Sequence, residues 1–194
     1  MADELKRRLV HASGSGLVAL FLLARYLEFP LSWGRFQVLM FLLSLGVIAL
    51  EFLRLRVGLE WWIYEKLTRE YEQDQFAGYG YYMVSMTVVV LLFDPEIALP
   101  AMLMLALGDP ISGALSDDTL RRVKSPTVLA ATFGVMLVLA LPFLPPAAAV
   151  AAALGATLAD GVKVMYGDFV LDDNLTIPIY AAVLAYLVLA FLPV

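Results

Sequence analysis

Two acidic segments of this sequence combine carboxylates with cations at spacings that suit phosphoryl transfer. In the first, Asp109 interrupts an apolar run at Gly108-Asp109-Pro110, where small residues let a ligand approach the backbone. The polar stretch that follows contains Asp117, Asp118, Arg121, Arg122, Lys124 and Ser125. Phosphoryl transfer depends mostly on positioning and charge neutralisation, so a carboxylate for Mg²⁺ followed by cations for phosphates indicates this chemistry. A polar loop at the cytoplasmic side of a membrane explains the same residues equally well.

The second acidic segment precedes the last apolar run and contains Asp160, Lys163, Asp168, Asp172, Asp173 and Asn174. Mg²⁺ prefers oxygen ligands, usually one or two carboxylates completed by phosphate oxygens and waters. Asp160 lies within an apolar run, which is costly unless its side chain faces a polar cavity. For Asp172, Asp173 and Asn174 the alternative is capping of the helix that follows, because these residue types favour the N-cap position.

Basic residues near the N-terminus form a third candidate. His11 lies one helical turn after Arg7 and Arg8, and its imidazole has the chemistry to bind phosphate or to accept a proton. The alternatives are that these basic residues only set the membrane topology and that the histidine is structural.

Glu51 and Arg54 lie three residues apart at the end of another apolar run. This spacing predicts either an ion pair at the membrane interface or an arginine that reaches a phosphate. Arg69, Glu70 and Glu72 are further polar candidates, for which a solvated helix face is the simpler explanation.

The composition places the chain in a membrane. Of its 194 residues, 62% are hydrophobic and only 16% charged, with a mean hydropathy of +0.84, whereas soluble domains are less apolar and more charged. The chain has no cysteine and one histidine, which excludes disulfides, thiolate catalysis and Cys- or His-rich metal sites. A net charge of −5 argues against nucleic-acid binding, which needs a basic face.

The apolar runs have the length of membrane-spanning helices, which need about 20 residues each. We expect spans at about Ala12–Phe29, Phe36–Leu53, Tyr79–Phe93, Glu96–Leu107, Thr127–Phe143, Ala147–Met165 and Leu175–Pro193. The short fourth span continues through Ile111–Leu115 as a broken helix. Residues 54–76 mix charges with Trp61 and Trp62, which predicts an amphipathic helix in the headgroup layer. The expected fold is an all-α transmembrane bundle of about seven spans, forming a single domain over residues 1–194.

Basic residues are distributed unevenly between the two sides of this bundle. With seven spans, one side carries the N-terminus and residues 54–78, 108–126 and 166–174. All Lys and Arg residues except Arg25 and Arg35 lie on or near that side. By the positive-inside rule it is cytoplasmic, and the C-terminus is outside. The acidic clusters share this side, whereas a transporter places its polar groups near the midplane of the bilayer.

Together these motifs resemble those of the CTP-dependent lipid kinases of the dolichol kinase family, which are related to phosphatidate cytidylyltransferases. Six elements occur in order along most of the chain: Arg7-Arg8-x-x-His11, Glu51-x-x-Arg54, Arg69-Glu70-x-Glu72 before a Gly-aromatic span, Gly108-Asp109-Pro110, Lys124-Ser125 and Asp172-Asp173-Asn174-Leu175-Thr176-Ile177-Pro178. The last is the most specific. Pro126 and Thr127 replace the Glu-Gly-Ser/Thr-like stretch that usually follows Lys-Ser in such kinases.

The resemblance implies that CTP, or another nucleoside triphosphate, phosphorylates the hydroxyl of a polyprenol or a similar long-chain lipid alcohol. It implies a Mg²⁺ cofactor held by catalytic Asp109 and Asp173 and by Asp172. The phosphates are assigned to Arg7, Arg8, Arg54, Lys124 and Ser125, with Asn174 orienting metal or phosphate. The candidate bases are His11 and Asp160.

Two other functions agree with the same residues. One is a cytidylyltransferase that joins CTP to a lipid phosphate, and the other is a non-enzymatic transporter of lipids or small molecules. We expect an integral protein of the plasma membrane in a prokaryote or of the endoplasmic reticulum in a eukaryote, with its site facing the cytoplasm. Its expected partners are membrane lipids and, in an oligomer, further copies of the chain.

Overall fold

In the computed structural model the chain is almost entirely helical, as the sequence predicts. The structure describes residues 2–58, 68, 73–116, 123–162, 165–166 and 169–192, without the side chains of 2–5, 7, 165–166 and 169–170. In this part of the chain, four helices are long and apolar enough to cross a membrane: Arg8–Tyr26, Trp33–Val57, Pro95–Leu115 and Asp173–Phe191. Three shorter apolar helices lie beside them, at Gly78–Leu92, Pro126–Ala140 and Pro146–Gly161.

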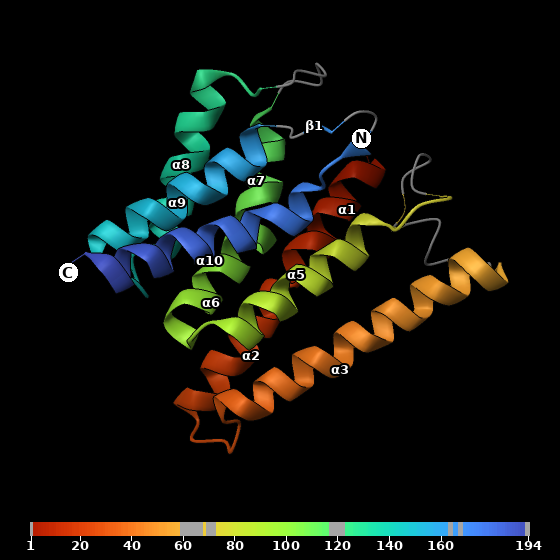
Figure 1. The fold of residues 1–194 in the computed structure, drawn as a ribbon, viewed down its shortest axis with the longest axis horizontal. Coiled ribbons are helices and arrows are strands. Elements are labelled where there is room, and N and C mark those ends of the chain that lie inside the picture. The colour runs from red at the N-terminus through yellow and green to blue at the C-terminus, as the bar shows by residue number, and fades with distance from the viewer. Residues whose placement is uncertain are drawn as a thin grey trace.

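These segments are built from helical elements and one short hairpin (Figure 1). In chain order they are α1 (Ala2–Ser13), α2 (Ser15–Tyr26), α3 (Trp33–Phe52), η1 (Leu53–Val57), α5 (Gly78–Leu92), α6 (Pro95–Leu103), η3 (Met104–Gly108), α7 (Asp109–Leu115), α8 (Pro126–Ala140), α9 (Pro146–Gly161), β1 (Met165–Tyr166), β2 (Phe169–Val170) and α10 (Asp173–Phe191). The two strands pair antiparallel, with Met165 opposite Val170 and Tyr166 opposite Phe169. η1 and η3 are π-helical turns within longer helices.

Small residues let α9 and α10 pack closely. α9 buries a row of alanines that includes Ala148, Ala152 and Ala156, and α10 buries Ala181, Ala182 and Ala185. A Cβ added at Gly155 would lie only 2.7 Å from the Tyr180 carbonyl oxygen. Small residues at such interfaces allow close backbone approach, and the resulting van der Waals packing is one of the forces that associate helices in lipid.

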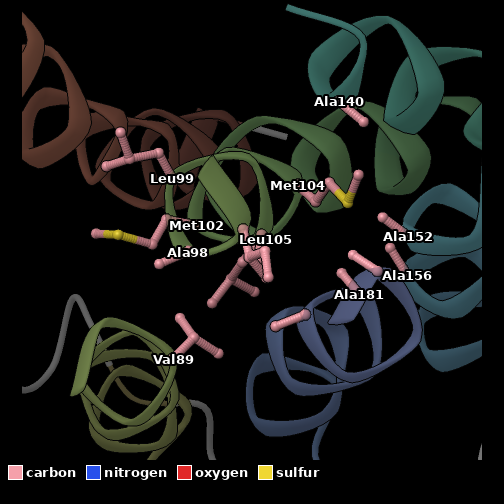
Figure 2. Close-up of a cluster of buried hydrophobic side chains, with 14 of the residues drawn as sticks. Val89, Ala98, Leu99, Met102, Met104, Leu105, Ala140, Ala152, Ala156 and Ala181 are labelled. Carbon is pink, nitrogen blue, oxygen red and sulfur yellow. The ribbon is translucent and has the colours of Figure 1, made fainter. Parts of the chain in front are cut away.

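The core lies where α6 and η3 pass between the other helices. Figure 2 shows Leu105 of η3 among side chains of α5, α6, α9 and α10. α3 lies at the edge of the bundle, packed mainly on α5 (Figure 1). Its side chains Val38, Leu42 and Ile48 are exposed, as expected of a helix that faces lipid.

Polar side chains on α3 and α5 bond to backbone carbonyls across their interface. Gln37 Nε2 donates to the Val90 carbonyl over 3.0 Å, and Thr87 Oγ1 donates to the Met40 carbonyl over 3.1 Å. Such bonds give polar side chains at a helix interface a hydrogen-bond partner.

Pro178 interrupts the backbone hydrogen bonding of α10 near its start. A proline has no N–H, so the carbonyl of the residue four positions earlier, Asn174, loses its helical partner. The buried Ser85 of α5 supplies a replacement, donating its hydroxyl proton to that carbonyl over 2.6 Å. This bond ties the start of α10 to α5.

The helix boundaries follow the predicted runs closely, and the fourth run does continue, through η3, into α7. The amphipathic helix predicted for residues 54–76 falls largely on residues that the structure does not describe.

We expect Gly155→Ala to destabilise the protein, because the new methyl group would force α9 away from the backbone of α10. Overpacking of this kind costs about 1–3 kcal/mol. Thermal unfolding in detergent micelles measures the effect. Gly134→Ala on α8 is the matched control, since nothing lies within 4 Å of its added Cβ. Equal unfolding temperatures for the two variants would contradict the tight packing of α9 on α10.

Candidate functional site

A network of four polar side chains joins α7, α8, α9 and the segment before α8. Lys124 Nζ lies 2.8 Å from both carboxylate oxygens of Asp160 and 2.9 Å from Ser112 Oγ. Ser112 Oγ donates to Asp160 Oδ2 over 2.6 Å, and Thr132 Oγ1 donates to Ser112 Oγ over 2.8 Å. The Asp160 side chain is fully buried, whereas that of Lys124 is 22% exposed. The carboxylate of Asp160 is therefore buried and fully hydrogen-bonded, whereas the Lys124 side chain remains partly accessible.

Backbone contacts place Lys124 beside Asp160. Val123 and Val162 form an antiparallel bridge, and Lys124 N donates to the Gly161 carbonyl over 3.0 Å. Ser125 is the N-cap of α8, where its hydroxyl accepts a hydrogen bond from Val128 N at 3.4 Å. The segment before α8 is thus held against the end of α9, with Ser125 in a capping role.

His11 links α1 to the π-helical turn η3. Its Nε2 lies 3.0 Å from the Leu105 carbonyl oxygen and 3.4 Å from Asp109 Oδ2. The π-turn and Pro110 leave that carbonyl without a backbone donor, because Asp109 N–H bonds to the Met104 carbonyl and proline has no N–H. A carbonyl only accepts, so Nε2 carries the proton that makes this bond.

The surroundings of His11 fix its ring. Tyr82 packs edge-on against the imidazole, with ring centroids 4.5 Å apart, and donates its hydroxyl proton to the His11 carbonyl over 2.9 Å. Tyr82 also lies so near Gly14, between α1 and α2, that a Cβ there would overlap its hydroxyl. The side chains of His11 and Asp109 are 18% and 23% exposed, respectively, so both are only partly buried.

Several of the predicted residues meet at one end of the bundle. Asp109 lies close enough to Asp173, Asp160 and Lys124 to interact electrostatically with each of them. Arg8 Nη2 donates to the Gly113 carbonyl over 3.1 Å, which joins α1 to α7. The start of α1, α7, the end of α9 and the start of α10 lie together in the upper part of Figure 1. The Arg7 side chain lies outside the described residues.

The start of α10 is capped by its own acidic segment. Asp172 Oδ1 accepts hydrogen bonds from Asn174 N at 2.9 Å and from Asn174 Nδ2 at 2.8 Å. The capping alternative of the sequence analysis therefore describes Asp172. Asn174 Oδ1 is buried and has no hydrogen-bond partner among the described residues, a property that it shares with Thr157 Oγ1. A buried amide oxygen in this state is suited to a cation or donor of a ligand.

Arg54 belongs to a second, separate network with Glu51. Its Nε donates to Glu51 Oε2 over 2.9 Å and its Nη2 to Glu51 Oε1 over 2.5 Å, while Nη1 and Nη2 also donate to the carbonyls of Gln73 and Gln75. Glu51 accepts further hydrogen bonds from Ala77 N and the Tyr79 hydroxyl. The side chains of Glu51 and Arg54 are 1% and 8% exposed. The predicted ion pair thus fastens the end of α3 to the segment before α5.

Sequence reasoning missed Ser112, Thr132 and Tyr82. Single hydroxyls inside apolar helices carry no pattern that separates a network member from an isolated polar residue. Pro110, by contrast, is a usable signal, because its missing N–H predicts an unpaired carbonyl nearby.

Among the described residues, no group of three or more His, Cys, Asp or Glu side chains is arranged to hold a metal ion alone. Six further candidate residues lie outside the described part of the chain: Asp117, Asp118, Arg121, Arg122, Lys163 and Asp168. No family model, curated protein or solved structure matched the chain.

Replacing Glu51 with alanine should strongly destabilise the protein. The change leaves the Arg54 guanidinium buried without its carboxylate and removes the acceptor of Ala77 N–H. Breaking a buried ion pair from one side costs roughly 3–5 kcal/mol. The free energy of unfolding, measured by titration with a denaturing detergent, tests this. The exposed Glu96, in the first turn of α6, is the control, and Glu96→Ala should cost less than about 1 kcal/mol. Similar losses in both variants would show that the Glu51 network is not structural.

Proposed function

We propose that this protein is a CTP-dependent kinase that phosphorylates the hydroxyl of a polyprenol-type lipid at the cytoplasmic surface of its membrane. The observation that supports this most directly is the convergence of Asp109, Asp160, Asp173 and Lys124, which lie far apart in the sequence. Carboxylates beside a partly exposed cation suit a polyphosphate with its metal ion. The order of motifs along the sequence supports the same reaction.

In the proposed reaction the lipid hydroxyl oxygen forms a bond to the γ-phosphorus of CTP. The bond from that phosphorus to the β–γ bridging oxygen breaks, and CDP leaves with the electron pair. The hydroxyl proton passes to a base, for which we assign His11 Nδ1, since Nε2 already donates to the Leu105 carbonyl. The partly exposed ammonium group of Lys124 and the guanidinium of Arg8 neutralise phosphate charge.

The donor set fits a magnesium ion that arrives with the nucleotide. Asp109 and Asp173 lie within electrostatic range of each other, and the buried Asn174 Oδ1 has no partner among the described residues. Mg²⁺ usually takes only one or two carboxylates and completes its shell with phosphate oxygens and waters. We assign Asp109 and Asp173 to this ion, and Asn174 to its orientation. When bound, the ion supplies charge neutralisation at the transferred phosphoryl group.

Two other predicted groups, Asp160 and Arg54, receive structural roles in this proposal. Both oxygens of Asp160 are occupied by Lys124, so we assign Asp160 to holding the lysine rather than to accepting the substrate proton. Arg54 serves the Glu51 network.

The proposal also includes seven spans, with the N-terminus in the cytoplasm and the C-terminus outside. The three shorter helices, of 15, 15 and 16 residues, cross the bilayer with the flanking polar segments at their ends. An odd number of spans places the first and last residues on opposite sides.

The chain has no cysteine, so single-cysteine variants test this topology directly. In sealed, right-side-out membranes, a membrane-impermeant maleimide should label Leu192→Cys without permeabilisation and Lys6→Cys only after it. The cysteine-free parent chain is the control for background labelling. Labelling of both sites from one side would show an even number of spans.

Incubation of the purified protein with γ-labelled nucleotides and a panel of lipid alcohols tests the reaction. Label should pass from CTP to a polyprenol-type alcohol, with CDP as the other product. Asp109→Asn should lower kcat by about 100-fold or more, because it removes charge that organises the transferred phosphate. The control is Asp94→Asn, since Asp94 is exposed beside the start of α6.

Other products would overturn the kinase assignment. Pyrophosphate formed from CTP and a lipid phosphate would identify a cytidylyltransferase. Movement of a substrate into liposomes without nucleotide consumption would identify a transporter. Equal kcat values for Asp109→Asn and Asp94→Asn would remove Asp109 from the site.

A further inference from the structure

We propose that Ser112 is a positioning residue that holds the Lys124 ammonium group in place for the substrate phosphates. The inference deepens the proposed function and rests on it for its catalytic consequence. Its structural part, that the Ser112 hydroxyl fixes Lys124, stands on the geometry of the network alone.

The hydroxyl of Ser112 is used to its full capacity. A serine hydroxyl has one proton to donate and two lone pairs to accept with. Ser112 donates to Asp160 Oδ2 and accepts from Lys124 Nζ and Thr132 Oγ1, at distances of 2.6, 2.9 and 2.8 Å. Each bond restricts the direction of the others, so the hydroxyl cannot rotate without breaking one of them. It therefore sets the angle at which the lysine meets its carboxylate.

Asp160 alone would hold Lys124 less firmly. An ammonium group is a compact charge on a flexible stem, and it can move around a carboxylate while keeping its ion pair. Ser112 adds a second, fixed acceptor on a different helix, α7. The three N–H groups of Lys124 thus face three acceptor atoms, the two carboxylate oxygens of Asp160 and the hydroxyl of Ser112. The lysine side chain is 22% exposed, so its positive charge is accessible to a phosphate.

Ser112 itself does not contact the substrate in this arrangement. Its exposed fraction is 0%, as is that of Thr132, so both lie behind Lys124. The residue lies one turn after Asp109 on α7, which carries the carboxylate assigned to the metal ion. One short helix thus carries the carboxylate of Asp109 and, through Ser112, holds the cation of Lys124.

The test compares four variants of the full chain in detergent: Ser112→Ala, Ser112→Cys, Thr132→Val and Ser116→Ala. The cysteine nearly fills the space of the serine but hydrogen-bonds weakly, which guards against a misfolded alanine variant. Ser116, the C-cap residue of α7, bonds only to the Ser112 backbone carbonyl in the described part of the chain and is the matched control. The first readout is acylation of Lys124 relative to the exposed Lys6 within the same molecules, by peptide mass spectrometry.

Loss of the Ser112 hydroxyl should raise the Lys124-to-Lys6 acylation ratio about 10-fold in both Ser112 variants, the usual effect of removing a hydrogen bond to a charged group. The ratio should rise less than threefold in Thr132→Val and stay unchanged in Ser116→Ala. An unchanged ratio in both Ser112 variants, or an equal rise in Ser116→Ala, would overturn the positioning role.

The second readout is phosphoryl transfer, which separates positioning from a general loss of structure. In Ser112→Cys, kcat should fall about 10-fold while KM for the nucleotide changes less than threefold, because the bond to phosphate matters most in the transition state. A rise in KM with unchanged kcat would contradict the proposal. If the unmodified protein transfers no phosphate, the proposed function fails, while the acylation ratios still decide whether Ser112 fixes Lys124.

Discussion

The ion pair between Lys124 and Asp160 is the interaction on which the candidate site depends. A carboxylate buried at the end of an apolar helix is stable only when its charge and lone pairs are matched, because desolvation costs several kcal/mol. Lys124 and Ser112 supply that match, and they bring the segment before α8 and helix α7 to the end of α9. The need to pair the buried charge of Asp160 thus holds the segment before α8, helix α7 and the end of α9 together.

A second constraint, the satisfaction of backbone groups in lipid, explains the remaining contacts around the site. A carbonyl without a partner cannot turn to water inside a bilayer. Pro110 and the π-turn leave the Leu105 carbonyl without a backbone donor, and His11 Nε2 donates a hydrogen bond to it instead. Pro178 leaves the Asn174 carbonyl without a helical donor, and the Ser85 hydroxyl donates a hydrogen bond to it instead. In both places a polar side chain from another helix therefore replaces the missing backbone donor. Both carbonyls lie next to the residues assigned to phosphate and metal.

These two constraints differ in how far they can be predicted from sequence. Hydropathy located the helices well: the last run was predicted at Leu175–Pro193, and α10 spans Asp173–Phe191. The spacing of Glu51 and Arg54 predicted their ion pair, because partners three residues apart face each other on a helix. The hydrogen bond from Ser112 to Asp160 depends on how α7 packs against α9, and the residue pattern within either helix does not predict that packing. Prediction succeeded for local geometry and failed for the contacts that tertiary packing creates.

The same packing gives different environments to two carboxylates that have similar positions in the sequence. Asp109 and Asp160 each interrupt an apolar run, but the side chain of Asp160 is fully buried and that of Asp109 is 23% exposed. Both oxygens of Asp160 are bound by Lys124, whereas Asp109 lies next to His11 and within electrostatic range of a second acidic residue, Asp173. A carboxylate that is already neutralised gains little from a ligand, while one that faces like charge gains from a cation. This difference is why we assign Asp160 to the architecture of the site and Asp109 to its ligand.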